Sequence, residues 1–168
     1  WITWEKHLRN QTTSSALGAK LFVVDFGYKA KSVLRYLFST VATMRILVRE
    51  RPKLIFVQNP SLVLTLLALQ IGRLLRTPVV VDAHNAGLRP LDGRSRWANR
   101  LAGYAMRSAA LTIVTNPGLG EYVDKSGGRS AILPDPLPDI SCTQPVTPLR
   151  GKVNILFICT WASDEPFI

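Results

Sequence analysis

The chain has 168 residues, of which 47% are hydrophobic and 19% charged, so it predicts a folded domain of ordinary size and excludes a disordered protein. Lysine and arginine number 21 against 11 aspartates and glutamates, which gives a formal net charge of +10. Such an excess indicates an anionic partner, which can be a nucleic acid, an acidic lipid surface or a phosphorylated ligand.

Short apolar runs alternate with longer helical stretches along the first 133 residues. Strands are expected at Ile2–Trp4, Leu21–Asp25, Leu54–Gln58, Val79–Asp82, Leu111–Thr115 and Ala131–Leu133. Helices are expected at Arg9–Leu17, Ala30–Glu50, Ser61–Leu75, Ser95–Ser108 and Leu119–Lys125. This alternation, with unbroken apolar strands, predicts an α/β fold: a Rossmann-like parallel sheet with helices on both faces.

The helix expected at Ser61–Leu75 is apolar nearly all round. A membrane span needs about 20 apolar residues. This run is shorter, because Asn59 and Pro60 precede it and Arg73 and Arg76 close it. We therefore expect a core helix packed on the sheet.

The composition changes after Leu133. Residues 134–152 are rich in proline and have no periodicity, which predicts a stiff linker. A fresh apolar run at Val153–Ile158 then predicts a strand outside the main sheet, the first of a truncated second Rossmann-like domain at 153–168. The expected organisation is an acceptor-side domain at 1–133, the linker, and the start of a donor-side domain.

The cysteines indicate the cellular compartment of the protein, and the first residue bears on whether the sequence is part of a longer polypeptide. Cys142 and Cys159 have neither CxxC spacing nor histidine companions, so neither a zinc site nor a disulfide framework is expected, and a cytoplasmic setting is the default. With only two histidines, no metal site is expected at all. The chain begins with Trp1 and not with Met, which suggests an internal piece of a longer polypeptide.

One glycine pair imitates a nucleotide-binding motif. Gly118 and Gly120 follow an expected strand, but a dinucleotide fingerprint needs a third glycine, and position 123 is Val. Pro117 leads the pair, which favours the simple start of a helix. No phosphate-binding loop and no nucleophile-elbow motif occurs in the sequence.

Polar side chains gather where the apolar strands end. They are Asn59, Asp82, His84, Asn85 and Asn116, and the loop after the first strand adds Glu5, His7, Arg9 and Asn10. Because the carboxyl ends of parallel strands lie along one edge, these groups are expected to converge there. Imidazole and carboxamide groups both donate and accept hydrogen bonds, which suits a polyhydroxylated ligand. The alternatives are that Asp82 caps a turn and that His7 is a solvated residue opening a helix.

Three segments in this order resemble a known family. VQNPS follows the third strand, VVVDAHN forms and follows the fourth, and FICTWASDEPF follows the linker. Together they resemble GT-B glycosyltransferases, with the nearest likeness to the group of glycosyltransferase family 4 and the chitobiosyl-diphosphodolichol β-mannosyltransferases. Many family 4 enzymes have a Gly-Gly loop after the first strand, where this chain has WEKHLRN.

The resemblance implies two Rossmann-like domains, the first binding the acceptor and the second a nucleotide-sugar donor. It implies that His84 faces the transferred sugar and that basic side chains and a helix N-terminus, with no metal or other cofactor, stabilise the leaving diphosphate. Glu5, His7 and Asp82 are the candidate general bases. Arg9, Asn10, Asn59, Asn85 and Asn116 are the candidate substrate-binding residues. The donor-phosphate residues belong to the second domain, so 168 residues alone are expected to be inactive.

Two other functions compete with this hypothesis. A non-catalytic α/β ligand-binding domain would share every feature of the fold. A nucleic-acid-binding domain is suggested by charge alone, but the basic residues carry few interleaved aromatics and form no known motif. We therefore expect no nucleic acid among the partners.

The helix expected at Ser95–Ser108 carries two adjoining stripes. At about 100° per residue, Arg96, Arg100 and Arg107 fall on one stripe, and Trp97, Leu101 and Tyr104 on the next. A basic stripe beside an aromatic one suits a helix lying on an anionic membrane surface, so the protein is expected to be cytoplasmic and peripheral on the inner face of the membrane. The alternative is that the aromatic stripe packs on the sheet and the arginines are simply solvated.

Overall fold

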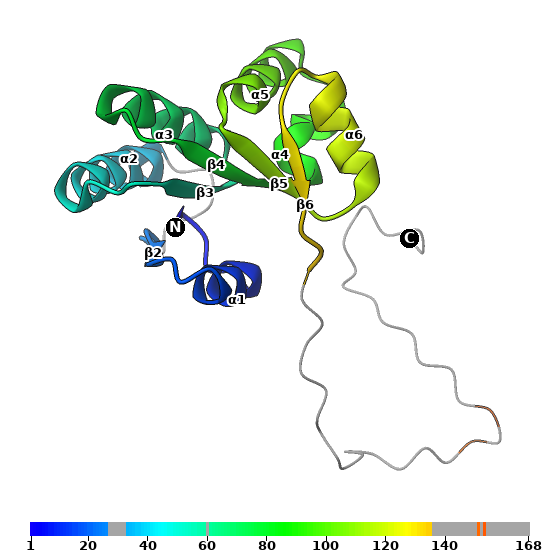
Figure 1. The fold of residues 1–168 in the computed structure, drawn as a ribbon, viewed down its shortest axis with the longest axis horizontal. Coiled ribbons are helices and arrows are strands. Elements are labelled where there is room, and N and C mark those ends of the chain that lie inside the picture. Colours follow the sequence, from blue (N-terminus) through cyan, green and yellow to red (C-terminus); the bar gives the residue numbers. More distant parts are fainter. Residues whose placement is uncertain (27–32, 60, 136–150, 152, 154–168) are drawn as a thin grey trace. The chain divides into compact units, whose positions relative to one another are not determined.

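Six parallel strands form one sheet in the order β2-β1-β3-β4-β5-β6 (Figure 1). The computed structural model describes residues 1–26, 33–59, 61–135, 151 and 153. The strands are β1 (Ile2–Thr3), β2 (Phe22–Val23), β3 (Ile55–Asn59), β4 (Val79–Ala83), β5 (Leu111–Val114) and β6 (Ser130–Ile132). All six coincide with the expected runs, so the predicted α/β class with a parallel sheet is confirmed.

The helices are α1 (Leu8–Ala16), α2 (Val33–Glu50), α3 (Leu62–Leu75), α4 (Asn85–Leu88), α5 (Arg96–Ser108) and α6 (Pro117–Lys125), with a short 3₁₀ turn η1 (Pro90–Gly93). Side-chain caps fix four of the described helix starts: Ser61, Ser95 and Asn116 each accept a hydrogen bond from a backbone N–H three residues on, and His7 accepts one from two residues on. Helix α6 begins at Pro117, which confirms that the glycine pair there opens a helix. The sequence analysis did not predict α4 or η1.

The winding of the chain changes direction between β1 and β3. From β1 the chain moves to β2 on one side, and from β3 it proceeds through β4, β5 and β6 on the other side. In open α/β sheets, ligands bind outside the carboxyl ends of the strands at such a switch point. The fold therefore directs attention to the loops that follow β1, β3 and β4.

The two faces of the sheet are covered by different helices. Side chains alternate between the faces along β4, and Val79 and Val81 join the apolar core that includes Leu64 and Leu69 of α3. Asp82 points the other way and bonds to Arg9 of α1. Helix α3 packs against both α2 and α5, so these three form a layer opposite α1 (Figure 1). The predicted covering of both faces is confirmed.

Helix α3 is the core helix that the sequence predicts. Leu64 and Ala68 are fully buried, and Gly72 approaches β4 so closely that a Cβ there would lie 2.5 Å from Cγ2 of Val79. No helix in the described part of the chain combines the length and the hydropathy that a bilayer span requires.

Residues 1–136 form one compact unit. Of the expected linker and second-domain start, only Pro134, Asp135, Gly151 and Val153 are described. The strand expected at Val153–Ile158 therefore lies outside the described residues, and so do both cysteines.

Candidate functional site

Two histidines meet at the carboxyl edge of the sheet. His7 ends the loop after β1 and caps α1, where its Nδ1 accepts a hydrogen bond from the backbone N–H of Arg9 at 3.3 Å. His84 follows β4 and stands at the N-cap of α4. The ring centroids of His7 and His84 are 6.0 Å apart. The structure thus brings together two imidazoles that are far apart in the sequence.

The ring of His84 has a nitrogen without a partner. Its Nε2 is buried and makes no hydrogen bond to any described residue, and its backbone N–H donates to the carbonyl of Asn59 at 3.3 Å. A buried polar atom left unbonded costs about 1–3 kcal/mol. A ligand atom between the two histidine-bearing loops would remove this cost.

Asn59 lies beside His84 at the end of β3. Its Nδ2 donates to the carbonyl of Gly87 at 3.3 Å, while its buried Oδ1 has no partner among the described residues. A Cβ built on Gly87 would lie 2.6 Å from both Cγ and the carbonyl oxygen of Asn59. Glycine at position 87 therefore allows α4 to close over Asn59, which sets the distance between the loops after β3 and β4.

Replacing Gly87 with alanine is expected to push the Asn59 carboxamide away and to lower the free energy of unfolding by about 1–3 kcal/mol. Urea denaturation of the two proteins measures this difference. Gly118→Ala is the matched control, because a Cβ there would meet nothing nearer than Oδ1 of Asn116 at 3.4 Å. An equal stability of Gly87→Ala and wild type would show that α4 does not pack on Asn59.

A buried polar network underlies the histidines. Oε1 of Gln58 accepts hydrogen bonds from Nδ2 of Asn10 at 2.6 Å and from Oγ1 of Thr3 at 2.7 Å. These three residues come from β3, α1 and β1, so the network joins the elements on both sides of the switch point. The sequence analysis did not single out Gln58. The available signal was its polar side chain directly before Asn59, inside an apolar strand.

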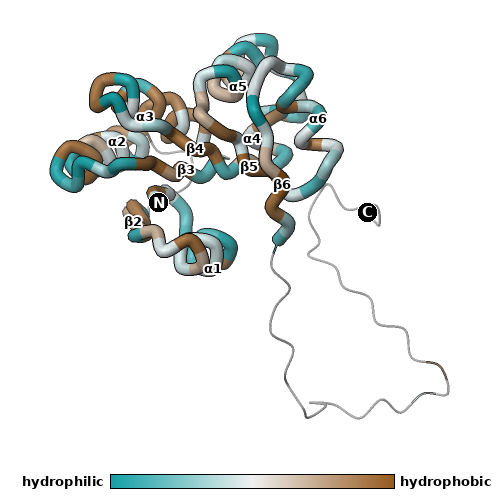
Figure 2. Tube along the Cα trace, in the orientation of Figure 1, coloured by the Kyte–Doolittle hydropathy of each residue, from teal (hydrophilic) through white to brown (hydrophobic). Residues whose placement is uncertain are grey.

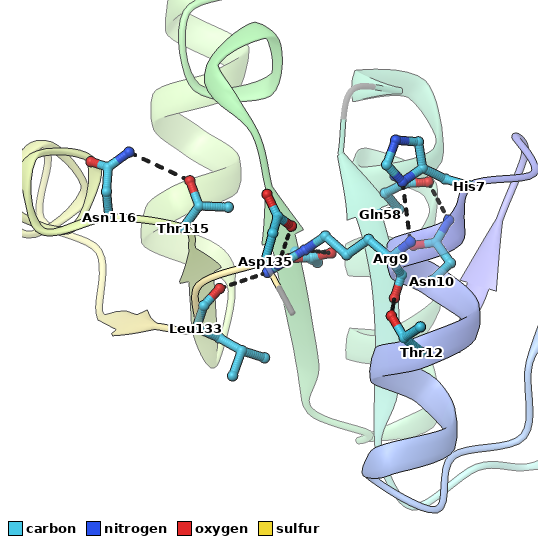
Figure 3. Close-up of polar contacts among 10 residues, drawn as sticks. His7, Arg9, Asn10, Thr12, Gln58, Thr115, Asn116, Leu133 and Asp135 are labelled. Atoms are coloured by element: carbon cyan, nitrogen blue, oxygen red, sulfur yellow. Dashed lines mark hydrogen bonds and ion pairs between the residues drawn. The ribbon is translucent and has the colours of Figure 1, made fainter. Parts of the chain in front are cut away.

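Arg9 is the centre of a second buried cluster (Figure 3). Its Nε and Nη2 bond to the carboxylate of Asp82 at 3.0–3.2 Å, and its Nη2 also donates to the carbonyl of Leu133 at 3.0 Å. Its Nη1 forms an ion pair with Oδ1 of Asp135 at 2.6 Å. Arg9 and Asp82 are almost completely buried, with 3% and 1% of their surfaces exposed. One guanidinium thus joins α1 to β4 and to the residues that follow β6.

Burial by itself would lower the pKa of Arg9, but its hydrogen bonds and charge interactions with Asp82 and Asp135 outweigh burial and raise the pKa above the ordinary value. Arg9 therefore carries its positive charge at neutral pH. Asp82 does not cap a turn, as the alternative would have it. Its carboxylate is held by Arg9, and the role of both residues toward a substrate stays a prediction.

The remaining predicted site residues are exposed. Glu5 is exposed, with Oε1 3.6 Å from Nη2 of Arg35. Asn85 is exposed as the first residue of α4. Asn116 is also exposed and uses Oδ1 to cap α6, accepting from the N–H of Leu119 at 3.0 Å. Figure 3 shows Asn116 on the far side of Asp135 from His7. Across the described ranges, no three His, Cys, Asp or Glu side chains could together hold a metal ion.

The predicted surface patch on α5 faces outward. Trp97 is 74% exposed and has Arg100 over its ring at 5.6 Å, so this aromatic residue does not pack on the sheet. Arg96 and Arg107 are exposed as well. Tyr104 leans toward α3, where its hydroxyl accepts a hydrogen bond from Arg73 at 2.6 Å. The basic and aromatic stripes therefore share one accessible surface.

Residues 3–133 match the family described as the glycosyl transferase 4-like domain. The match covers most of the chain. It begins at Thr3 in β1 and includes all the other strands of the sheet through β6. The chain therefore belongs to this family, and its partners are in general a sugar donor and an acceptor. No curated protein matches the chain. The more specific likeness to β-mannosyltransferases has no support in these comparisons.

Proposed function

We propose that this chain is the acceptor-side half of a glycosyltransferase that moves a hexose from a nucleotide-sugar donor to a hydroxyl of a glycan or a polyprenyl-diphosphate-linked acceptor. One observation carries the proposal: Nε2 of His84 is buried without a described partner, in a ring that lies 6.0 Å from that of His7 at the carboxyl edge of the sheet. The membership in the glycosyl transferase 4-like family makes sugar transfer the reaction that such a site serves.

The transfer requires a base and a positioned hydroxyl. An acceptor O–H gives its proton to the base, its oxygen bonds to the anomeric carbon, and the bond from that carbon to the nucleoside diphosphate breaks. Since Nδ1 of His7 accepts a hydrogen bond, the neutral His7 ring carries its proton on Nε2 and can donate to a hydroxyl. His84 was not among the bases expected from the sequence, but its Nε2 has no described partner, so in this proposal His84 takes the role of the base.

The other candidates take supporting roles in this proposal. Asp82 is a positioning residue, because Arg9 binds its carboxylate and buries it. Asn59 and Asn10 each have a carboxamide oxygen without a described partner, and these oxygens suit hydroxyl groups of a sugar. The donor diphosphate is expected on a second domain, stabilised by basic side chains and a helix N-terminus without a metal ion.

Sugar transfer by the chain joined to its donor-side domain tests the proposal. The protein is incubated with labelled UDP-glucose, UDP-N-acetylglucosamine and GDP-mannose, each with a polyprenyl-diphosphate-linked saccharide as acceptor. Labelled lipid-linked product is the expected result. Specific binding of a saccharide without transfer from any donor would instead favour a non-catalytic ligand-binding domain. Oligonucleotide binding with a salt slope of several charges would favour the nucleic-acid alternative.

A lipid-linked acceptor places the reaction at a membrane, and the α5 patch is the predicted contact. Each basic residue near an anionic surface contributes on the order of 1 kcal/mol. Reversing Arg96 and Arg100 to Glu is therefore expected to weaken binding to anionic vesicles by at least about tenfold, measured by co-sedimentation. Equal binding to neutral and anionic vesicles, or binding to neither, would leave this patch as an ordinary solvated surface.

A further inference from the structure

Helix α2 has its polar side turned inward. Arg35, Ser39 and Thr43 follow one another at intervals of four residues on its buried side. A surface helix normally buries its apolar stripe and exposes its polar one. In α2 the order is reversed from Arg35 to Thr43, whereas Leu47 further along joins the core in the ordinary way. An apolar stripe of the helix therefore faces away from the domain.

The residues after β1 account for this orientation. The indole N–H of Trp4 donates to Oγ1 of Thr43 at 2.9 Å, and Nη2 of Arg35 donates to the carbonyl of Trp4 at 3.0 Å. These bonds join two turns of α2 to Trp4, a buried residue directly after β1. Rotating the helix to bury its apolar stripe would break them, so the exposed apolar stripe is a fixed feature of the fold.

The outer surface of the α2–α3–α5 layer consequently exposes several large apolar side chains. The exposed apolar residues of α2 are Val33, Leu34, Leu37, Phe38, Met44 and Val48, each between 42% and 81% exposed. Val63 and Leu74 extend the surface onto α3, and Trp97 and Leu101 onto α5. Figure 2 shows the apolar residues along α2 and α3. The number of large apolar side chains exposed on one helix layer, unlike single exposed leucines, indicates a site of interaction with a protein or a membrane.

The charge of this surface selects the partner. Exposed arginines border the apolar residues at positions 45, 49, 73, 96, 100 and 107. The three helices contain a single acidic residue, Glu50, and its carboxylate bonds to Lys20 at 2.8 Å. Anionic lipid headgroups complement such a surface. A second copy of this chain does not, because a symmetric contact would set arginines against arginines.

We infer that the outer surface of α2, α3 and α5 binds an anionic bilayer, with the exposed leucines of α2 inserted at headgroup depth and the arginines on lipid phosphates. The inference rests on the proposed function in placing α5 at a membrane, and it adds α2 as the inserting element. Helix α2 lies in the plane of the interface, since no described helix can span a bilayer.

The test is the double variant Leu34→Gln, Leu37→Gln in the full chain. Both side chains are more than half exposed, at 55% and 56%, so the fold is expected to survive, which circular dichroism and thermal melting check. Co-sedimentation uses vesicles of phosphatidylcholine with and without 30% phosphatidylglycerol. We expect wild type to bind only the anionic vesicles and the double variant to bind them at least about tenfold more weakly.

Leu17→Gln is the matched control. Leu17 is 52% exposed but ends α1, on the opposite side of the sheet, so its replacement should leave vesicle binding unchanged. Unchanged binding of the Leu34, Leu37 variant would overturn the inference. The inference would also be overturned if light scattering showed that the wild type is a dimer and the variant a monomer. That result would favour a second copy of the chain as the partner of this surface. Because vesicle binding needs no turnover, an inactive protein that still binds through α2 would contradict only the proposed function.

Discussion

Replacing Arg9 with alanine is expected to lower the free energy of unfolding by about 3–5 kcal/mol, the range found when one partner of a buried ion pair is removed. The loss follows because the carboxylate of Asp82, 1% exposed, would remain buried without its cation. The same change would free α1 from β4 and from the carbonyl of Leu133. Urea denaturation followed by far-ultraviolet circular dichroism measures the difference.

Two further variants distinguish the loss of the Arg9–Asp82 ion pair from a nonspecific loss of stability. Asp135→Asn breaks the solvent-facing contact of Arg9, whose aspartate is 62% exposed, and should cost less than about 1 kcal/mol. The double variant Arg9→Ala, Asp82→Ala should lose less than the sum of the single losses, because no charge is then left buried. Additive losses would show that Arg9 and Asp82 stabilise the fold separately.

The pKa shift of Arg9 fixes the pH window of its contribution. Because the folded-state pKa is raised above the unfolded value, the stabilisation by this shift is fully present below the unfolded pKa and is lost only as pH rises through the folded one. The pKa of an arginine in the unfolded chain already lies far above neutral pH. The deficit of Arg9→Ala is therefore expected to stay constant from neutral to moderately alkaline pH.

Replacing His84 with alanine is expected to reduce kcat/KM for sugar transfer by about 10²–10⁴, the range that a general acid–base group contributes. The stability should change by less than about 1 kcal/mol, because the removed ring has no hydrogen bond at Nε2 to lose. Steady-state kinetics of the chain joined to its donor-side domain gives the first quantity, and thermal melting of the same samples gives the second.

His7→Ala is the informative comparison. His7 caps α1 through Nδ1, so its loss should cost about 0.5–2 kcal/mol of stability, with a smaller effect on kcat than at His84. If His84→Ala instead melts the protein and leaves kcat/KM unchanged in the folded fraction, the histidine is structural and the site assignment fails. His84→Ala is thus expected mainly to lower the rate, and His7→Ala mainly to lower the stability.

The sequence predicts the strands and long helices well because each is a run of apolar residues with one dominant period. The spatial order of β1 and β2 could not be predicted, because the sequence of a two-residue strand does not determine which neighbouring strand it pairs with. Helix α4 was missed for a related reason: four residues make one turn, which is too short for a periodic pattern. Its N-cap residue, His84, makes no side-chain capping hydrogen bond, and its close contact to Asn59 depends on Gly87.

The site was predictable where it follows from topology alone. The adjacency of His84 and Asn59 follows from parallel neighbouring strands that end at one edge. The burial of Arg9 does not, because its partners Asp82 and Asp135 are 73 and 126 residues away along the chain. The same limit applies to α2, whose reversed orientation depends on hydrogen bonds to Trp4 that no hydrophobic pattern encodes.

The Arg9 cluster anchors helix α1 independently of the exposed loop that precedes it. The loop of residues 5–7 is exposed and leads into α1, while α1 itself is anchored one turn later by Arg9 and Asn10. An exchange of Glu5 and Lys6 that retains His7 as the cap of α1 would keep these anchors and alter only residues that the proposed function places toward a ligand. If the proposed function holds, these two positions are a starting point for changing the acceptor specificity without disturbing the support of α1.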